Sequence, residues 1–559
     1  ERRWYRYHHL FGDLLRQRLS HHLDAGDEAA ARAQLHLRAS RWYEENGLEV
    51  EAFQHATAAP DIERATYLLA GKGMPLHFRG AVTPVLNWLK SLPTTVLDAN
   101  PTLWVMYASA LSMTGQLAGV EERLQAAESA LENAELNDKT RNLIGHIAAI
   151  RALLAASQLQ VGAIIEQSQR ALEYLHPQNF SVRTATTWKL GFAYQLQGDR
   201  TAAMQAYRDA IATSATTGNM VIHVAATINL GRVQELQNQL HAAAESYQRA
   251  VQLTEKSAQP ALSDAHLGLG RLYYEWHDFT AAQQHLAQSL HCAQQINNSD
   301  RVVGTQLILA QLKLAQGEAD EAAVLLAKAE QVIHQHNFMA QFLELAAVQI
   351  LLHLRLGNLR TAEQLAQQHK LPLSQARIYL RQGNIESALA LLERVGEQAS
   401  LKNLQDQRLK VLVLQAAVLH AQGHLNQAIQ PLNEALTLAE PHGFVRTFVD
   451  EGAPIAELLT LMKNRNLGSQ PYITKLLEAF ATEAFYPSSL IPQPLIDPLS
   501  ERELEVLQLI AQGLSNKEIS AELFLALSTV KGHNRNIYDK LQVQRRTEAV
   551  LRGRELGLL

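Results

Sequence analysis

The sequence predicts an all-α protein in which an array of repeated helix pairs precedes a small domain of short helices. Turn residues recur at intervals close to 40 residues, and an alanine follows most of these turns at a fixed distance. Residues 499–559 contain three short segments with helical periodicity, each preceded by a serine. A chain of 559 residues is long enough for an extended array and one further domain.

The amino end begins abruptly in an amphipathic pattern. Glu1 is not an initiator methionine, and residues 4–16 have helical periodicity from the start. We therefore expect a piece of a longer protein. Histidine pairs at 8–9 and 21–22 raise the question of a metal site. Without nearby cysteines or a second ligand pair, surface histidines are the favoured interpretation.

Small turn residues mark the repeat. They are Gly115, Ser157, Gly198, Asn238, His277, Gly317, Gly357, Gly383 and Gly423. Five residues after most of them stands an alanine. These alanines are Ala203, Ala243, Ala282, Ala322, Ala362, Ala388 and Ala428, and Gly47 with Ala52 is a candidate earlier copy. Each unit is predicted to be a helix, a turn and a second helix whose alanine permits close approach.

One interval is shorter than the others. Gly357 and Gly383 are separated by 26 residues, where neighbouring turns are separated by 40. The difference corresponds to about four helical turns at 3.6 residues per turn. We expect this shortened unit to change the curvature of the array locally.

Two segments carry a recognisable repeat pattern. Residues 188–199 with Ala203 and Tyr207 resemble a tetratricopeptide repeat, as do residues 267–274 with Ala282 and Leu286. The resemblance implies a helical-repeat superhelix, here assigned to residues 36–479, with a concave surface for a ligand or a regulatory protein. Exposed residues that could line it are Tyr194, Arg232, Arg271, Tyr274, Gln311 and Arg377. Ordinary packing and solvated positions are the favoured interpretation of these six.

A proline-rich linker is expected at residues 480–498. Pro492, Pro494 and Pro498 interrupt the helical periodicity there. Such a segment is a semi-rigid tether that can reposition the domain that follows it.

The C-terminal domain begins with two capping boxes. Ser500 with Glu503, and Ser515 with Glu518, have the spacing in which a serine and a glutamate satisfy each other's backbone amides. Gly513 suits the end of the first helix. Ser528 is predicted to cap a third helix that runs to about Leu541. The second and third helices then form a helix-turn-helix, whose second helix enters the major groove of DNA.

The third helix separates into two faces at about 100° per residue. Val530, Ile537 and Leu541 are predicted to face the core. The outer arc consists of Ser528, Thr529, Lys531, Gly532, Arg535 and Asp539.

Each side chain near this arc has an expected role. Lys531 and Arg535 are one turn apart and could reach guanine in the major groove. Gly532 lets the backbone approach DNA. Phosphate contacts are expected from Ser528, Thr529, Lys540 and Arg546.

His533 is either a pH-sensitive contact or, as we favour, a half-buried packing residue. Asn534 points toward the core and needs a buried partner or water.

The charge distribution favours DNA binding only in one part of the C-terminal domain. The chain has 50 Lys+Arg and 55 Asp+Glu, which gives a formal net charge of −5. Between Lys531 and Arg546, five basic residues accompany the single acidic residue Asp539. A solvated charged face would explain such a run, but its coincidence with the outer arc favours an electrostatic footprint for DNA.

Residues 499–507, 513–519, 528–533 and 536–541 together resemble the LuxR-type helix-turn-helix. The resemblance implies a four-helix DNA-binding domain over residues 499–559, with Lys531, Gly532 and Arg535 facing bases. It also implies a fourth helix, from about Arg546 through Leu556, that often supports a dimer. Asn534 departs from the pattern, because many members carry an apolar residue there.

The amino end adds a second resemblance. Residues 4–16 resemble the segment that closes the winged-helix part of MalT-like regulators, so residues 1–35 are assigned as its remnant. The resemblance implies that ATP binds an upstream nucleotide-binding module. Because the chain has no Gly-x-x-x-x-Gly-Lys-Ser/Thr loop, no cofactor is assigned to it, and ATP is expected only in a missing upstream module.

Composition excludes several other classes of protein. The single cysteine, Cys292, cannot form an internal disulfide, and no apolar run is long enough to span a bilayer. A cytoplasmic protein without membrane attachment is expected. We also expect no enzyme, because no phosphate loop, metal-ligand cluster or nucleophile-base arrangement is present.

These observations favour a sequence-specific DNA-binding transcription regulator, which we interpret as an activator although no residue distinguishes activation from repression. Its expected partners are double-stranded DNA, RNA polymerase, and an unknown inducer or regulatory protein on the repeats, with self-association on DNA half-sites. The alternative is a helical-repeat scaffold for protein interactions, whose C-terminal domain is not a specific DNA reader.

Overall fold

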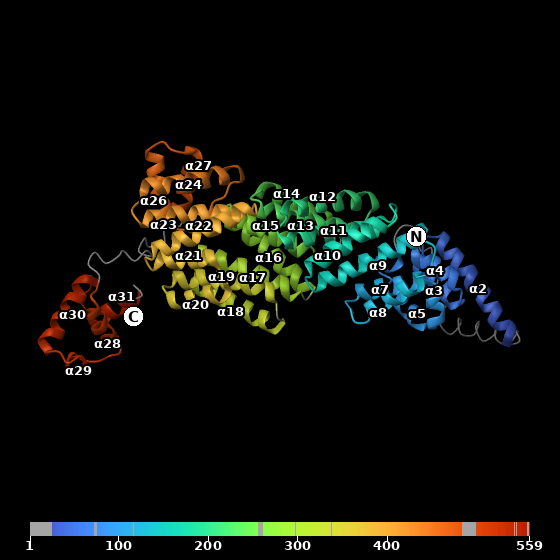
Figure 1. Cartoon of the computed structure of the whole chain (residues 1–559), viewed down its shortest axis with the longest axis horizontal. Helices are drawn as coiled ribbons and strands as arrows, with labels where there is room; N and C mark the ends of the chain where they lie inside the picture. Colours follow the sequence, from blue (N-terminus) through green and yellow to red (C-terminus); the bar gives the residue numbers. More distant parts are fainter. Residues whose placement is uncertain are drawn as a thin grey trace. The chain divides into compact units, whose positions relative to one another are not determined.

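The computed structural model describes residues 25–71, 75–115, 117–132, 134–254, 261–296, 298–336, 338–482, 499–541, 543, 545–555 and 558. Within these ranges the regular elements are all helices (Figure 1). The predicted all-α class is therefore confirmed. Contacts along the chain divide it into two units, Glu1–Ala226 and Thr227–Leu559.

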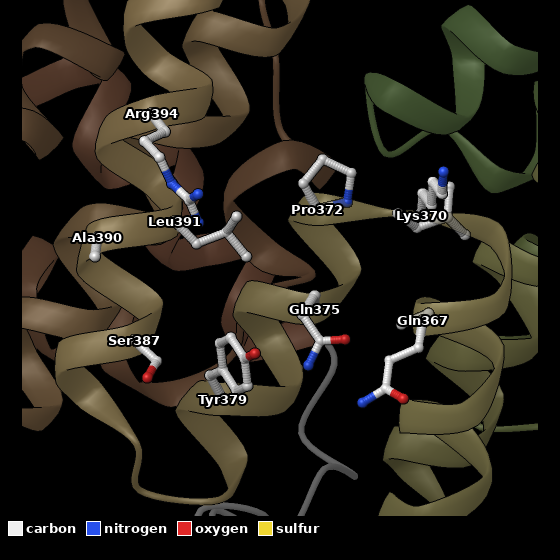
Figure 2. A pocket seen from close by; sticks show the side chains of 11 residues that line it. Gln367, Lys370, Pro372, Gln375, Tyr379, Ser387, Ala390, Leu391 and Arg394 are labelled. Carbon is white, nitrogen blue, oxygen red and sulfur yellow. The ribbon is translucent and has the colours of Figure 1, made fainter.

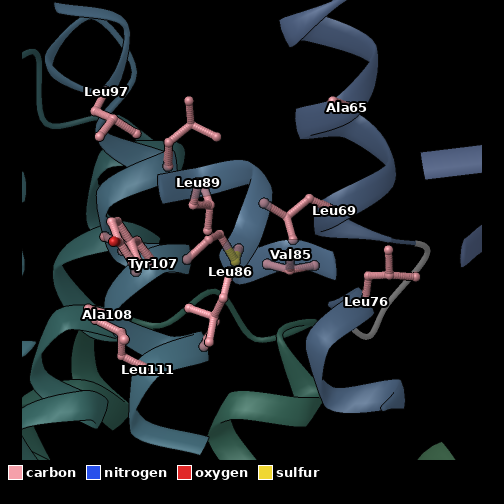
Figure 3. Packing of buried hydrophobic residues seen from close by; sticks show 14 of the residues in the cluster. Ala65, Leu69, Leu76, Val85, Leu86, Leu89, Leu97, Tyr107, Ala108 and Leu111 are labelled. Carbon is pink, nitrogen blue, oxygen red and sulfur yellow. The ribbon is translucent and has the colours of Figure 1, made fainter. Parts of the chain in front are cut away.

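The helices of the first unit alternate with short turns. They are α2 (Ala25–Glu45), α3 (Glu49–Ala58), α4 (Ile62–Ala70), η1 (Leu76–Arg79), α5 (Val82–Ser91), α6 (Thr94–Asp98), α7 (Pro101–Met113), α8 (Val120–Leu131), α9 (Asp138–Ser157), α10 (Val161–Tyr174), α11 (Phe180–Gln197) and α12 (Arg200–Thr217). A hydrophobic core joins α3 to α9, and Figure 3 shows Leu69, Val85 and Leu89 packed together within it.

Helix α13 (Met220–Leu236) leads into the second unit. The helices that follow are α14 (Leu240–Thr254), α15 (Ala261–Glu275), α16 (Phe279–Gln295), α17 (Ser299–Ala315), α18 (Ala319–His336), α19 (Met339–Arg355), α20 (Leu359–His369), α21 (Pro372–Arg381), α22 (Ile385–Leu401), α23 (Gln405–Ala421), α24 (Leu425–Ala439), η2 (Glu440–His442), α25 (Arg446–Val449), α26 (Ala453–Asn464) and α27 (Gln470–Thr482). The last four are α28 (Glu501–Ala511), α29 (Asn516–Glu522), α30 (Leu527–Leu541) and α31 (Arg546–Glu555).

The predicted turns separate the two helices of each pair. A left-handed backbone, with positive φ, occurs at eight of the nine predicted positions. These are Gly115, Gly198, Asn238, His277, Gly317, Gly357, Gly383 and Gly423. The prediction of Ser157 as the ninth is wrong, because α9 continues through Ser157 and Leu159 carries the positive φ of 54°. Leu159 escaped detection because leucine rarely adopts this conformation.

The alanines after these turns are buried. All seven predicted alanines, and Ala52 in the earlier copy, have an exposed fraction of 0%. Between the helices, glycine makes room for aromatic rings: a Cβ on Gly231 would lie 2.9 Å from the Tyr247 ring, and one on Gly268 would lie 2.4 Å from it. Tyr247 is fully buried between these two glycines.

The shortened unit is confirmed as two short helices. α20 has 11 residues and α21 has 10, whereas α19 and α22 on either side have 17 each. Lys370 ends α20 in a left-handed conformation, and Pro372 starts α21. The missing residues thus come from the C-terminal end of one helix and the N-terminal end of the next.

In the second unit, the segment after α24 contacts the turn between α15 and α16. The Val445 amide donates to the Glu275 carbonyl at 3.1 Å, and the Trp276 indole donates to the His442 carbonyl at 3.0 Å. Arg446 is fully buried, with its guanidinium 5.4 Å from the centre of the Tyr274 ring. These contacts join residues more than 160 positions apart in sequence.

Three side chains considered for the concave surface have internal partners. Arg271 pairs with Glu235 at 2.8 Å, and Arg377 pairs with Glu451 at 2.6 Å. Tyr274 donates to Asp450 at 3.0 Å. These contacts agree with the favoured interpretation of ordinary packing.

Several predictions fall outside the described residues. They include the helix at residues 4–16, the histidine pairs, and most of the linker at residues 480–498; the assigned domain boundaries stay predictions. Among the helices that the structure describes, none combines the length and apolar composition needed to cross a membrane. The described part of the chain also holds no group of three or more His, Cys, Asp or Glu side chains suited to a metal ion.

Substituting Leu159→Gly should stabilise the protein by about 0.5–1 kcal/mol, because glycine adopts positive φ without the steric cost that leucine incurs. The leucine side chain is 61% exposed, so few contacts are lost. The midpoint of urea unfolding measures the change. Leu136→Gly is the matched control, since that leucine is 58% exposed and lies outside the set of positive-φ residues. Equal destabilisation by both substitutions would contradict the prediction.

Candidate nucleic-acid interface

Two reciprocal capping boxes start the first two helices of the C-terminal domain. The Ser500 and Ser515 side chains accept from the amides of Glu503 and Glu518, and both glutamates accept from the serine amides in return. Glu503 Oε2 lies 2.8 Å from the Ser500 amide. The predicted starts of α28 and α29 are therefore confirmed.

The turns after α28 and α29 use left-handed residues. Gly513 follows α28 with a φ of 91°, as predicted, and Phe524 follows α29 with a φ of 52°. Arg502 holds the second turn, since its Nη2 donates to the Leu523 carbonyl at 2.8 Å. The Phe524 side chain is 96% exposed.

Ser528 is not the residue that caps the third helix. α30 begins at Leu527, and the Ala526 carbonyl accepts from the amides of Thr529 and Val530 at 2.9 and 3.2 Å. Ala526 therefore occupies the capping position, where its methyl group cannot accept a hydrogen bond. Ser528 already lies in the first turn, with its side chain exposed.

The two predicted faces of α30 are present. Val530 and Ile537 are fully buried and Leu541 is 2% exposed, in a core shared with α28, α29 and α31. The six residues of the predicted outer arc, Ser528, Thr529, Lys531, Gly532, Arg535 and Asp539, are all exposed. His533 is half-buried, as favoured. Asn536 is also exposed, a position to which the sequence reasoning gave no role.

Asn534 is buried, and its hydrogen-bond partner, Asn516, is half-buried. Its Nδ2 donates to Asn516 Oδ1 at 2.8 Å, and its own Oδ1 is buried without a partner among the described residues. Arg546 donates to the same Asn516 oxygen at 3.2 Å and also bonds to the Leu514 carbonyl. Asn516 thus links α29, α30 and α31. The sequence reasoning missed it because its neighbour Ser515 explained the local pattern.

Lys540 and Glu503 form a nearly buried ion pair. Lys540 Nζ lies 2.9 Å from Glu503 Oε2, and the two side chains are 19% and 5% exposed. Burial raises the pKa of Glu503, but the hydrogen bonds from Ser500 and Lys540 outweigh it and lower that pKa to about 2. The carboxylate is therefore charged at neutral pH, and it ties the start of α28 to the end of α30.

Fewer basic side chains are available for DNA contact than the sequence implied. Lys540 and Arg546 were expected at phosphates, but the structure engages both with other parts of the domain. Arg535 remains 85% exposed, 3.9 Å from Asp539, which is 73% exposed. At such exposure this pair is weak and easily exchanged for another anion. A Cβ on Gly532 would meet nothing within 4 Å, so the surface beside Lys531 and Arg535 is open.

Two protein families match the chain. Residues 145–465 match the family described as "MalT-like TPR region", and residues 497–552 match "Bacterial regulatory proteins, luxR family". The first match covers more than half of the chain and the second covers all of α28, α29 and α30.

Similar proteins cover almost the whole chain. The "HTH-type transcriptional regulator MalT" of Cronobacter sakazakii is 27% identical over 99% of this chain, and that of Serratia proteamaculans is 25% identical over 99%. Both alignments span 64% of the relative, so the chain corresponds to about two thirds of their length. Among solved structures, the apo form of the quorum sensor NprR from B. thuringiensis is 13% identical, with a TM-score of 0.41; it covers 71% of this chain and 99% of its own.

Substituting Ala526→Ser should stabilise the C-terminal domain by about 0.5–2 kcal/mol, because a serine hydroxyl can accept a hydrogen bond from one of the free backbone amides at the start of α30. Hydrogen exchange of the α30 peptide in the full chain measures the effect. Ala521→Ser, at an exposed position near the end of α29, should give no protection. Unchanged exchange in Ala526→Ser would contradict the capping role.

Substituting Glu503→Gln should destabilise the domain at pH 7 by up to about 3 kcal/mol. The folded pKa of Glu503 is depressed to about 2 from 4.5. The contribution of the Glu503 carboxylate to the stability of the folded domain is therefore present above about pH 4.5 and is lost as the pH falls toward 2. Hydrogen exchange of α28 and α30 in the full chain should differ from wild type at pH 7 and converge in acid. Glu505→Gln, which removes an exposed carboxylate, is the control. A difference that persists unchanged at pH 2 would exclude this role of charge.

Proposed function

The chain belongs to the family with a MalT-like TPR region and carries a LuxR-family domain, and from this premise we propose that it is a DNA-binding transcription regulator. The repeats receive a signal, and α30 reads the operator in the major groove. Both MalT relatives are transcriptional regulators by name, which supports the proposal.

The exposed arc of α30 is the observation that carries this proposal. Lys531 and Arg535 lie one turn apart on the outer face, whereas Val530 and Ile537 fix the opposite face in the core. A basic pair presented by a buttressed helix can contact guanine O6 and N7. The open surface at Gly532 allows the backbone to approach the bases.

Phosphate contacts are assigned to the exposed first turn of α30. Ser528 and Thr529 lie there with accessible hydroxyls, at a helix end whose amides favour anions. For Lys540 and Arg546 we propose that phosphate contact is secondary to positioning. The bond from Lys540 to Glu503 orients α30 against α28, and the bonds from Arg546 to Asn516 and Leu514 hold α31 against the start of α29.

The remaining steps follow the same proposal. Self-association of the chain would place two copies of α30 on paired half-sites, for which α31 offers a surface. The bound pair would then activate transcription by contacting RNA polymerase. An inducer or regulatory protein on the repeats would control self-association. Such a regulator acts in the cytoplasm, where its DNA is.

The test is selection of bound sequences from randomised duplex DNA by the full chain at moderate salt. Wild type should recover a defined motif. The Lys531→Ala/Arg535→Ala variant should lose it, with operator affinity reduced at least tenfold, since each good base contact contributes about 1–3 kcal/mol of discrimination. Hydrogen exchange of α28 and α30 confirms that the variant stays folded.

The matched control removes two exposed cations from the repeats, Lys402→Ala/Lys463→Ala. It has the same net charge as the test variant and should keep the motif. Weak, salt-sensitive and sequence-blind binding by all three proteins would instead favour the scaffold alternative.

A further inference from the structure

The shortened unit leaves a pocket in the repeat array. It has a volume of about 540 Å³ and lies between α20, α21 and α22 (Figure 2). α22 keeps its full length while α20 and α21 are each several residues shorter than their counterparts, so the end of α22 has no paired segment of α21. Leu391 and Arg394, near the middle of α22, line the pocket.

Two cations face this pocket without partners. The side chains of Lys370 and Arg394 are exposed, and neither forms a hydrogen bond or ion pair with any residue that the structure describes. Figure 2 shows them on opposite sides of the pocket, with Gln375 between them. No Asp or Glu is among the residues that line it. The pocket therefore offers positive charge to a ligand from two sides.

Gln375 supplies a second and independent observation. Its side-chain nitrogen and oxygen are both buried, and neither has a hydrogen-bond partner among the described residues. A ligand or an ordered water can complete the hydrogen bonds of such an amide. Tyr379 and Ser387 bring hydroxyl groups to the same pocket, and Leu371, Pro372 and Leu391 form apolar walls.

We propose that this pocket binds a small organic anion, a carboxylate or phosphate ester that also carries hydrogen-bonding groups. The volume suits a small molecule and not a folded partner. Lys370 and Arg394 hold the anionic group, and Gln375 hydrogen-bonds to the polar remainder. The proposal rests on the proposed function only in its consequence, which is that the bound anion changes the affinity of the protein for DNA.

Isothermal titration of the full chain with glucose 6-phosphate, citrate and neutral glucose tests the binding step. At least one anion should bind saturably and more weakly at higher salt, whereas glucose should not bind. The Lys370→Gln/Arg394→Gln variant should lose at least tenfold in affinity. The control Arg360→Gln/Lys402→Gln removes two exposed cations outside the lining and should bind as wild type does. Absence of binding by both anions, or equal affinity in the two variants, would overturn the proposal.

The Gln375→Leu variant tests the amide. If the amide contacts the ligand, this variant should bind the anion at least fivefold more weakly while its unfolding temperature stays the same or rises. A stabilised protein with unchanged anion affinity would mean that Gln375 meets only water, which would overturn the assigned contact.

Operator affinity with and without the anion separates this proposal from the proposed function. An anion that binds but leaves DNA affinity unchanged would overturn the regulatory consequence alone. Loss of DNA recognition with intact anion binding would overturn the DNA-reader proposal and leave the pocket standing.

Discussion

Close contact between paired helices at a buried alanine is the interaction on which the array depends. Each repeat contacts mainly its neighbours, so the position of every later helix follows from the contact before it. At Ala243 and Ala282 the exposed fraction is zero, so a larger side chain there would have to be packed inside the core. The left-handed turn five residues earlier reverses the chain so that the second helix packs against the first at this alanine. Tyr247, between the glycines of two helices, locks adjacent repeats in the same way.

In the C-terminal domain, the basic residues form two groups. Lys540 bonds to a carboxylate and holds α30 against α28, and Arg546 bonds to amide and carbonyl oxygens and holds α31 against the start of α29. Lys531 and Arg535 point away from the core and remain available to a ligand. Glu503 connects α28 to α30, because one carboxylate completes a capping box and neutralises the lysine at the far end of α30.

The features that the sequence predicted well are those that depend on near neighbours. Helix periodicity, the serine and glutamate of a capping box, and the glycine of a turn all act within a few residues. The burial of Val530 and Ile537 followed from the 3.6-residue period alone. For Asn534, periodicity indicated the need for a buried partner but could not identify Asn516, which lies on another helix.

The features that were missed depend on contacts between distant residues or on tolerated strain. Leu159 adopts a conformation that its residue type disfavours, and Ala526 occupies a capping position without a capping side chain. Charge counting treated Lys540 as a free cation because its partner lies 37 residues away. The family match supports the fold, whereas the assignment of individual DNA contacts remains a proposal about geometry.

The contacts between the α15–α16 turn and the segment after α24 affect how the second unit folds. An open repeat array can begin folding at any unit and grow from it, since all its contacts are local. Here the bond from Trp276 to His442 closes a loop of 166 residues. Closing this loop lowers the conformational entropy of the chain, and this unfavourable step comes before Arg446 can be buried. We therefore expect the intervening repeats to fold slowly and to unfold together. A destabilising change at one end of them should then lower the stability of the other end.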